Sequence, residues 1–101
     1  MRVRLRPGSL ERVREWASEL NARRDEVLAT LRDEGVRIES VFLDGDTLVY
    51  YMRADSIEEA RAVYARSTHA IDAYHRRFKD ETFEEQRALE LLIDFENPAE
   101  S

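Results

Sequence analysis

The chain of 101 residues contains no cysteine, three glycines and two prolines, and it has no long apolar run. Without cysteine it can form no disulfide, no thiolate metal site and no thiol nucleophile. No stretch approaches the ~20 apolar residues of a membrane-spanning helix. The basic start, residues 1–6, also lacks the apolar core of a signal peptide. We therefore expect a soluble, cytoplasmic protein with no membrane partner.

Positive charge is scarce relative to negative charge, with 16 basic against 22 acidic residues and a formal net charge of −6. Nucleic-acid binding needs a basic surface or a concentrated basic stripe, so we expect no nucleic-acid partner. Glycine-rich phosphate loops, serine nucleophile elbows and spaced metal motifs are also missing. These absences exclude many common enzyme classes, and we expect no cofactor and no metal.

The first half of the chain shows three periodic patterns. Alternating apolar and basic residues predict a short strand over residues 2–6. Apolar residues at a spacing of three or four then predict one long helix from Ser9 to Gly35. Two runs rich in β-branched and aromatic residues, Val36 to Leu43 and Thr47 to Ala54, flank a turn sequence and predict an antiparallel hairpin.

The second half begins with Ser56-Ile57-Glu58-Glu59, a capping box that predicts the start of a helix. Serine and threonine compete with the helical backbone, so we expect a break around Ser67-Thr68-His69 before a second helical segment from about Ile71 to Asp80. Alternating apolar residues from Ala88 to Phe95 predict the last strand.

The order of these elements predicts an α+β fold of ferredoxin-like βαββαβ topology, in which a four-stranded antiparallel sheet carries its helices on one face. Residues 1–96 would form a single domain, and residues 97–101 a polar tail. The first and last strands would be neighbours, with Arg2, Arg4 and Arg6 beside Glu90, Asp94 and Glu96.

Both faces of the predicted hairpin are apolar. Leu48, Tyr50 and Met52 lie on one side of its second strand, and Val49 and Tyr51 lie on the other. The helices can cover only one of these faces. We therefore predict a homodimer whose two sheets pack face to face.

The run from Gly35 to Asp44, followed by Leu48 to Met52 and the capped helix from Ser56, resembles the dimeric α+β barrel superfamily. Within it, the chain is most similar to a small uncharacterised family of halophilic archaea and, more distantly, to the L-rhamnose mutarotases. The resemblance implies the ferredoxin-like fold and the homodimer. It implies no single activity, because the superfamily includes epimerising enzymes, monooxygenases, haem-degrading enzymes and binding proteins.

The mutarotase pattern departs from this sequence at its functional positions. The mutarotase histidine on the first helix falls at or near Leu20, which cannot move protons, and the paired tryptophans fall near Tyr74 and His75. We therefore transfer no activity from this resemblance.

Arg24 occupies a place in the first helical stripe where a core residue is expected. Its guanidinium either pairs with a structural acid such as Asp72 or Asp94, or faces a cleft and anchors a carboxylate or phosphate.

His69, Asp72 and His75 follow one another at steps of three and would share one helix face if the helix ran through them. Such a set could hold a divalent metal, or it could transfer protons, with Asp72 orienting a histidine. The predicted break leaves open whether His69 and His75 share a site. We assign no metal, and we take His75 and Asp72 as the candidate catalytic residues.

From these patterns we expect a homodimer that binds a small polar or anionic metabolite in the cleft between helices and sheet. The candidate ligand-binding residues are Trp16, Asn21, Arg24, Tyr51 and His69. One alternative is a cofactor-independent isomerase, mutarotase or monooxygenase that uses His75. Another is a structural or interaction module without a pocket. The sequence does not decide whether the protein is an enzyme.

Overall fold

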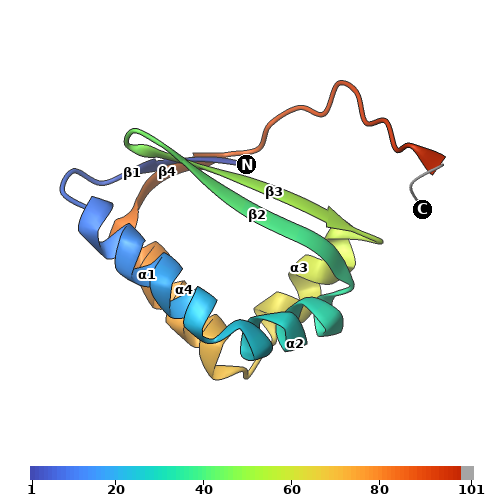
Figure 1. Cartoon of the computed structure of the whole chain (residues 1–101), viewed down its shortest axis with the longest axis horizontal. Helices are drawn as coiled ribbons and strands as arrows, with labels where there is room; N and C mark the ends of the chain where they lie inside the picture. The colour runs from blue at the N-terminus through green and yellow to red at the C-terminus, as the bar shows by residue number, and fades with distance from the viewer. Residues whose placement is uncertain (99–101) are drawn as a thin grey trace.

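The computed structural model describes residues 1–98. Within these residues the elements run in the order β1 (Arg2–Leu5), α1 (Leu10–Ala22), α2 (Arg24–Glu34), β2 (Val36–Asp44), β3 (Thr47–Ala54), α3 (Ile57–Ala65), α4 (Ala70–Thr82) and β4 (Phe83–Arg87). The strands form one antiparallel sheet in the order β2-β3-β1-β4, and the helices lie together on one side of it (Figure 1). The predicted α+β, ferredoxin-like fold is confirmed. None of the helices within residues 1–98 is long and apolar enough to cross a membrane.

The first helical region is two helices, so the prediction of one long helix is wrong. Arg23, with φ −105° and ψ 38°, separates α1 from α2. An unbroken helix of this length would measure roughly 37 Å, longer than the ~27 Å of an eight-residue strand such as β3. The bend lets α1 pack against α4 and α2 against α3, and the two pairs form a V below the sheet (Figure 1).

The local signals around the hairpin and the third helix are confirmed. β2 and β3 pair in register from Asp44 opposite Thr47, across a turn in which Gly45 has φ +61°. The Ser56 hydroxyl accepts a hydrogen bond from the Glu59 N–H at 3.2 Å, which caps α3. The predicted break between the last two helices lies between the end of α3 and the start of α4.

The last strand lies earlier than predicted. β4 begins at Phe83, directly after α4, and pairs with β1, so the first and last strands are neighbours as expected. The Arg6 N–H donates to the Thr82 carbonyl oxygen at 2.8 Å, which fixes this junction. Phe83 packs against the core cluster, and this contact brings the strand forward to the end of the helix. The prediction of a strand from Ala88 to Phe95 is wrong.

Residues 88–96, which we call the C-terminal arm, leave the sheet as an extended segment (Figure 1). The predicted ion pairs change accordingly. Arg4 pairs with Glu84 and Glu85, at 3.2 and 2.8 Å, instead of with the arm. The arm acids Asp94 and Glu96 pair with Arg53 on β3. Of the predicted polar tail, Asn97 and Pro98 are exposed, and residues 99–101 lie outside the described residues.

The core lies between β1, β3 and the helix pair α1 and α4. Its buried members are Val3, Leu5, Val13, Trp16, Leu48 and Phe78. Alternation along β3 decides which side chains join it, because Leu48 opposes Val3 in register while the neighbouring Val49 turns to the helix-free face. Tyr50 therefore faces the helices, and Tyr51 faces away from them.

Candidate functional site

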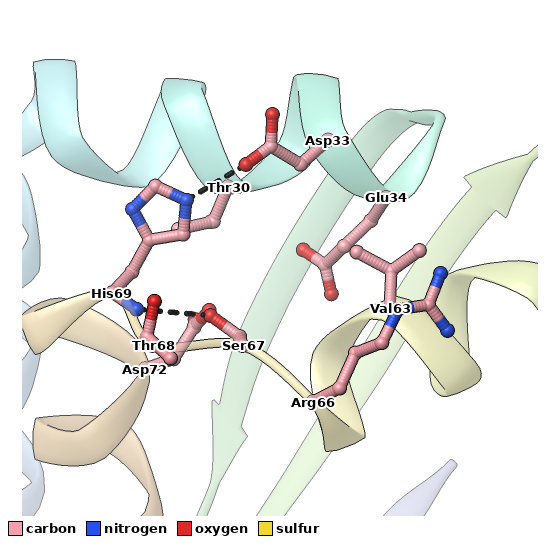
Figure 2. A pocket seen from close by; sticks show the side chains of 9 residues that line it. All are labelled: Thr30, Asp33, Glu34, Val63, Arg66, Ser67, Thr68, His69 and Asp72. Carbon is pink, nitrogen blue, oxygen red and sulfur yellow. Dashed lines mark hydrogen bonds and ion pairs between the residues drawn. The ribbon is translucent and has the colours of Figure 1, made fainter.

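A polar pocket of about 450 Å³ opens between α2, α3 and the connection from α3 to α4 (Figure 2). Its lining residues come from the end of α2, from Val63 on α3 and from the residues that break the second helical region. They are Thr30, Asp33, Glu34, Val63, Arg66, Ser67, Thr68, His69 and Asp72. The break in the helix therefore supplies much of the pocket wall.

His69 stands at the N-cap of α4 and bridges the two sides of the pocket. Its Nε2 lies 2.7 Å from Oδ2 of Asp33 on α2, and its backbone N–H donates to the Ser67 hydroxyl at 3.2 Å (Figure 2). The hydrogen bond to Asp33 is the main cause that raises the pKa of His69. This hydrogen bond favours the imidazolium form, which pairs with the Asp33 carboxylate, over the neutral ring.

Asp72 is the buried carboxylate of the pocket, with 7% of its surface exposed. Its Oδ2 accepts a hydrogen bond from the Ser67 hydroxyl at 2.5 Å. Ser67 thus donates to Asp72 and accepts from the His69 backbone, which fixes the loop relative to the first turn of α4.

Glu34, at the end of α2, carries the most perturbed carboxyl of the pocket. Burial raises its pKa from the usual 4.5 to about 7, and the neighbouring charges of Asp72, Glu39 and Asp33 act in the same direction. His69 acts in the opposite direction. Glu34 is therefore partly protonated at neutral pH and can both donate and accept hydrogen bonds there.

Trp16 and His75 belong to a second cluster, deeper between α1 and α4. The Trp16 Nε1–H donates to Nδ1 of His75 at 3.1 Å, and the two rings stack at 5.5 Å. Burial, helped by the charges of Lys79 and Arg76, lowers the pKa of His75 to about 4. Because Nδ1 accepts the hydrogen bond from Trp16, the neutral imidazole carries its own proton on Nε2. His75 is thus poised to donate a hydrogen bond and not to act as a general base.

Two tyrosines also lie close to His75. The rings of Tyr50 and Tyr64 each lie 6.3 Å from the His75 ring. Among the described residues, their hydroxyls are the buried side-chain polar atoms without a hydrogen-bond partner. Burial raises the pKa of both, that of Tyr64 to about 12, so both stay protonated and able to donate. Buried donors without an acceptor mark a place where a ligand or water would be favourable.

The remaining predicted site residues lie elsewhere. Arg24 is exposed, so its expected core position is wrong; the break at Arg23 turns α2 and moves this residue to the outside. Asn21 is exposed and donates to the Ala17 carbonyl oxygen at 2.9 Å. Tyr51 is on the helix-free face of the sheet, 41% exposed. Of the predicted set, the structure brings together His69 with Asp72, and Trp16 with His75.

The two histidines face different partners, Asp33 for His69 and Trp16 for His75. Within residues 1–98, no three histidine, aspartate or glutamate side chains are grouped so that they could hold a metal ion.

The sequence analysis does not predict Asp33, Glu34 and Arg66 as pocket residues, because in the sequence they look like solvent-exposed charges on helices. The only sequence signal near them was the helix break at Ser67.

Fold and pocket together define a small ferredoxin-like α+β protein with a polar pocket at the bend of its helices. The chain belongs to a family of unknown function, DUF6176, whose model matches residues 1–100. Searches of curated proteins and of solved structures gave no match.

Proposed function

We propose that the protein binds a small polar molecule in the polar pocket. The observation that carries this proposal is the pocket's chemistry: a buried Asp72, a Glu34 with raised pKa and an imidazole bridge surround a hollow of about 450 Å³. This volume lies within the range of small-molecule sites, ~300–1,000 Å³. Perturbed ionisable groups also concentrate at functional sites.

The pocket charges favour one kind of ligand. Three carboxylates, Asp33, Glu34 and Asp72, face two basic groups, Arg66 and His69. A free anion would meet an excess of carboxylate, whereas hydroxyl or amine groups would find acceptors at Asp72 and Glu34. Of the two ligand types expected from the sequence, polar and anionic, the polar one therefore has the stronger support.

Ligand binding can be tested without knowing the ligand. Native mass spectrometry of freshly purified protein would reveal a co-purifying molecule, and a library of small polyols and amines would then be screened by heteronuclear NMR. We expect shifts at Ser67, His69 and Asp72 that saturate with concentration. Asp72→Asn should weaken this binding, while Glu58→Gln, an exposed change on α3, should leave it unchanged. Binding that maps elsewhere, or that ignores Asp72→Asn, would contradict the proposal.

We also propose that the protein is a homodimer joined through the helix-free face of the sheet. Ile38, Phe42 and Tyr51 lie on this face with 45%, 59% and 41% of their surface exposed. Apolar side chains gathered on one uncovered sheet face support an association surface. Sedimentation equilibrium measures the subunit number directly, and a monomer at about 100 μM would contradict the dimer.

The isomerase, mutarotase or monooxygenase alternative has one observation in its favour. His75 Nε2–H and the hydroxyls of Tyr50 and Tyr64 are three neutral donors that could polarise a carbonyl or hydroxyl oxygen. In such an enzyme His75 would donate instead of accepting a proton. His75→Gln should then reduce turnover of a candidate substrate more than its binding, whereas equal losses would indicate a binding protein. The third alternative, an interaction module, predicts no pocket, and the hollow beside Asp72 speaks against it.

A further inference from the structure

The four most exposed large apolar side chains of residues 1–98 lie on the C-terminal arm. Its large apolar side chains are between 52% exposed, at Leu89, and 88% exposed, at Phe95. Leu91, Leu92 and Ile93 fall between these values. In a chain with 38% charged residues, such a concentration on one short segment marks a contact surface.

The arm also has the properties of a strand without a sheet. Leu89, Leu91, Ile93 and Phe95 alternate along it, yet it pairs with no strand among the described residues. None of the backbone hydrogen bonds within residues 1–98 links residues 88–96 to the body of the domain. An extended apolar segment with unpaired backbone groups is stable only when another surface covers it.

Arg53 on β3 joins the arm to the helix-free face of its own sheet. Its guanidinium contacts Asp94 and also lies 3.5 Å from Glu96. Arg53 opposes Ile38 in register, so the end of the arm is held at the residue that pairs with the exposed Ile38 of β2. The two arm acids share Arg53 as their basic partner, and the apolar side chains of the arm remain exposed. The exposed apolar residues of the arm and Ile38 on the sheet face therefore lie on either side of the Arg53 ion pairs.

We infer that the C-terminal arm of each copy packs across the helix-free sheet face of a second copy. A twofold arrangement lets two arms cover two faces at once, with the same residues on both sides of the contact. The arm's own sheet does not cover these side chains. The arm is already bound to that sheet through Arg53, and its apolar side chains are still exposed. We therefore favour a second copy as the partner. This inference rests on the proposed homodimer and not on the proposed ligand.

The test compares the full-length chain with an arm variant that carries Leu91→Ser and Ile93→Ser. Sedimentation equilibrium should show the unmodified chain as a dimer and should show dimer dissociation at least about 100-fold more favourable in the variant. Leu10→Ser, a change at a residue 46% exposed on α1, is the matched control and should alter dissociation by no more than about threefold. Circular dichroism would verify that each variant keeps the fold.

The possible failures are distinguishable. If the unmodified chain is a monomer at about 100 μM, both the homodimer and the arm contact are overturned. This conclusion holds even if a different protein covers the arm. If the chain is a dimer and the arm variant dimerises as tightly, the homodimer stands and the role of the arm is overturned. In either case the NMR test of the polar pocket is unaffected, because the pocket lies on the helix side of the sheet.

Discussion

Replacing Glu34 with glutamine should stabilise the folded protein more at pH 8 than at pH 5.5. Glu34 holds its proton more tightly in the folded state, where its pKa is about 7, than at its usual value of 4.5. Between these two pH values, Glu34 is mostly ionised in the unfolded chain and mostly protonated in the folded protein. Raising the pH in this range therefore favours the unfolded chain. The stability that protonated Glu34 contributes is therefore present at low pH and is lost as pH rises through about 7. Glutamine, which stays neutral, avoids this loss.

The magnitude follows from the difference between the two pKa values. A rise from 4.5 to about 7 corresponds to at most about 3 kcal/mol of lost stability at high pH. Glu34 is only half-buried, so solvent reduces this figure, and we expect about 1–2 kcal/mol at pH 8. The increase in the free energy of unfolding caused by Glu34→Gln should be smaller by about 1 kcal/mol at pH 5.5 than at pH 8.

The assay is urea unfolding of both proteins at several pH values, with the protein concentration held constant. Glu58→Gln is the control, because Glu58 is exposed and has no ion pair among residues 1–98, so its effect should not vary over this range. The reasoning would be refuted by a gain from Glu34→Gln that is equal at all pH values. Destabilisation at pH 8 would refute it too, because it would mean that a favourable partner holds the ionised carboxylate.

Three further substitutions test the core, a helix cap and the second cluster. Phe78→Ala should cost about 3–5 kcal/mol in urea unfolding, because Phe78 is fully buried and stacks on Trp16 at 4.3 Å; a cost below about 1 kcal/mol contradicts this packing. Ser56→Ala should cost about 1 kcal/mol and Ser56→Asp much less, since aspartate can also cap α3; equal losses in thermal melts would exclude the cap. Trp16→Phe removes the donor to Nδ1 of His75, so ¹⁵N NMR should show both neutral tautomers of the imidazole. A ring that stays entirely protonated on Nε2 would argue against this hydrogen bond.

The features predicted correctly from the sequence are those decided by local chemistry. The hairpin depends on a tight turn at Gly45, the start of α3 depends on the Ser56 hydroxyl, and the second helix break depends on Ser67. Each of these involves residues within a few positions of one another. Such signals do not require knowledge of the rest of the fold.

The two wrong element predictions both depend on distant contacts. Nothing local marks Arg23 as the end of α1, and the bend arises because each half packs against a different later helix. Residues 88–95 alternate more regularly than β4, but β4 directly follows α4 and lies beside β1. A regular pattern indicates that a segment suits a sheet; it does not supply the partner strand.

The candidate site can be predicted only in part from the sequence, because it too depends on distant contacts. His69 and Asp72 were selected because they share a helical spacing, and the structure places both in the polar pocket. Asp33 and Glu34 lie on α2, far away in sequence, and only the bend of the helices brings them to the pocket. The core position predicted for Arg24 depends on the periodicity of one long helix. The structure has two helices instead, and Arg24 is exposed at the start of the second.

The polar pocket and the apolar arm lie on opposite sides of the sheet, and the two faces of β3 differ in the same way. Its alternation turns Tyr50 toward His75 and the helices, while Tyr51 and Arg53 turn toward the arm. Alternate residues of β3 thus separate the cluster around His75 from the proposed association surface. The residues that line the pocket come from α2, α3, the connection from α3 to α4 and the first turn of α4, and none of them belongs to the arm. Loss of the arm contact should therefore reduce dimerisation without removing the groups that would bind a ligand.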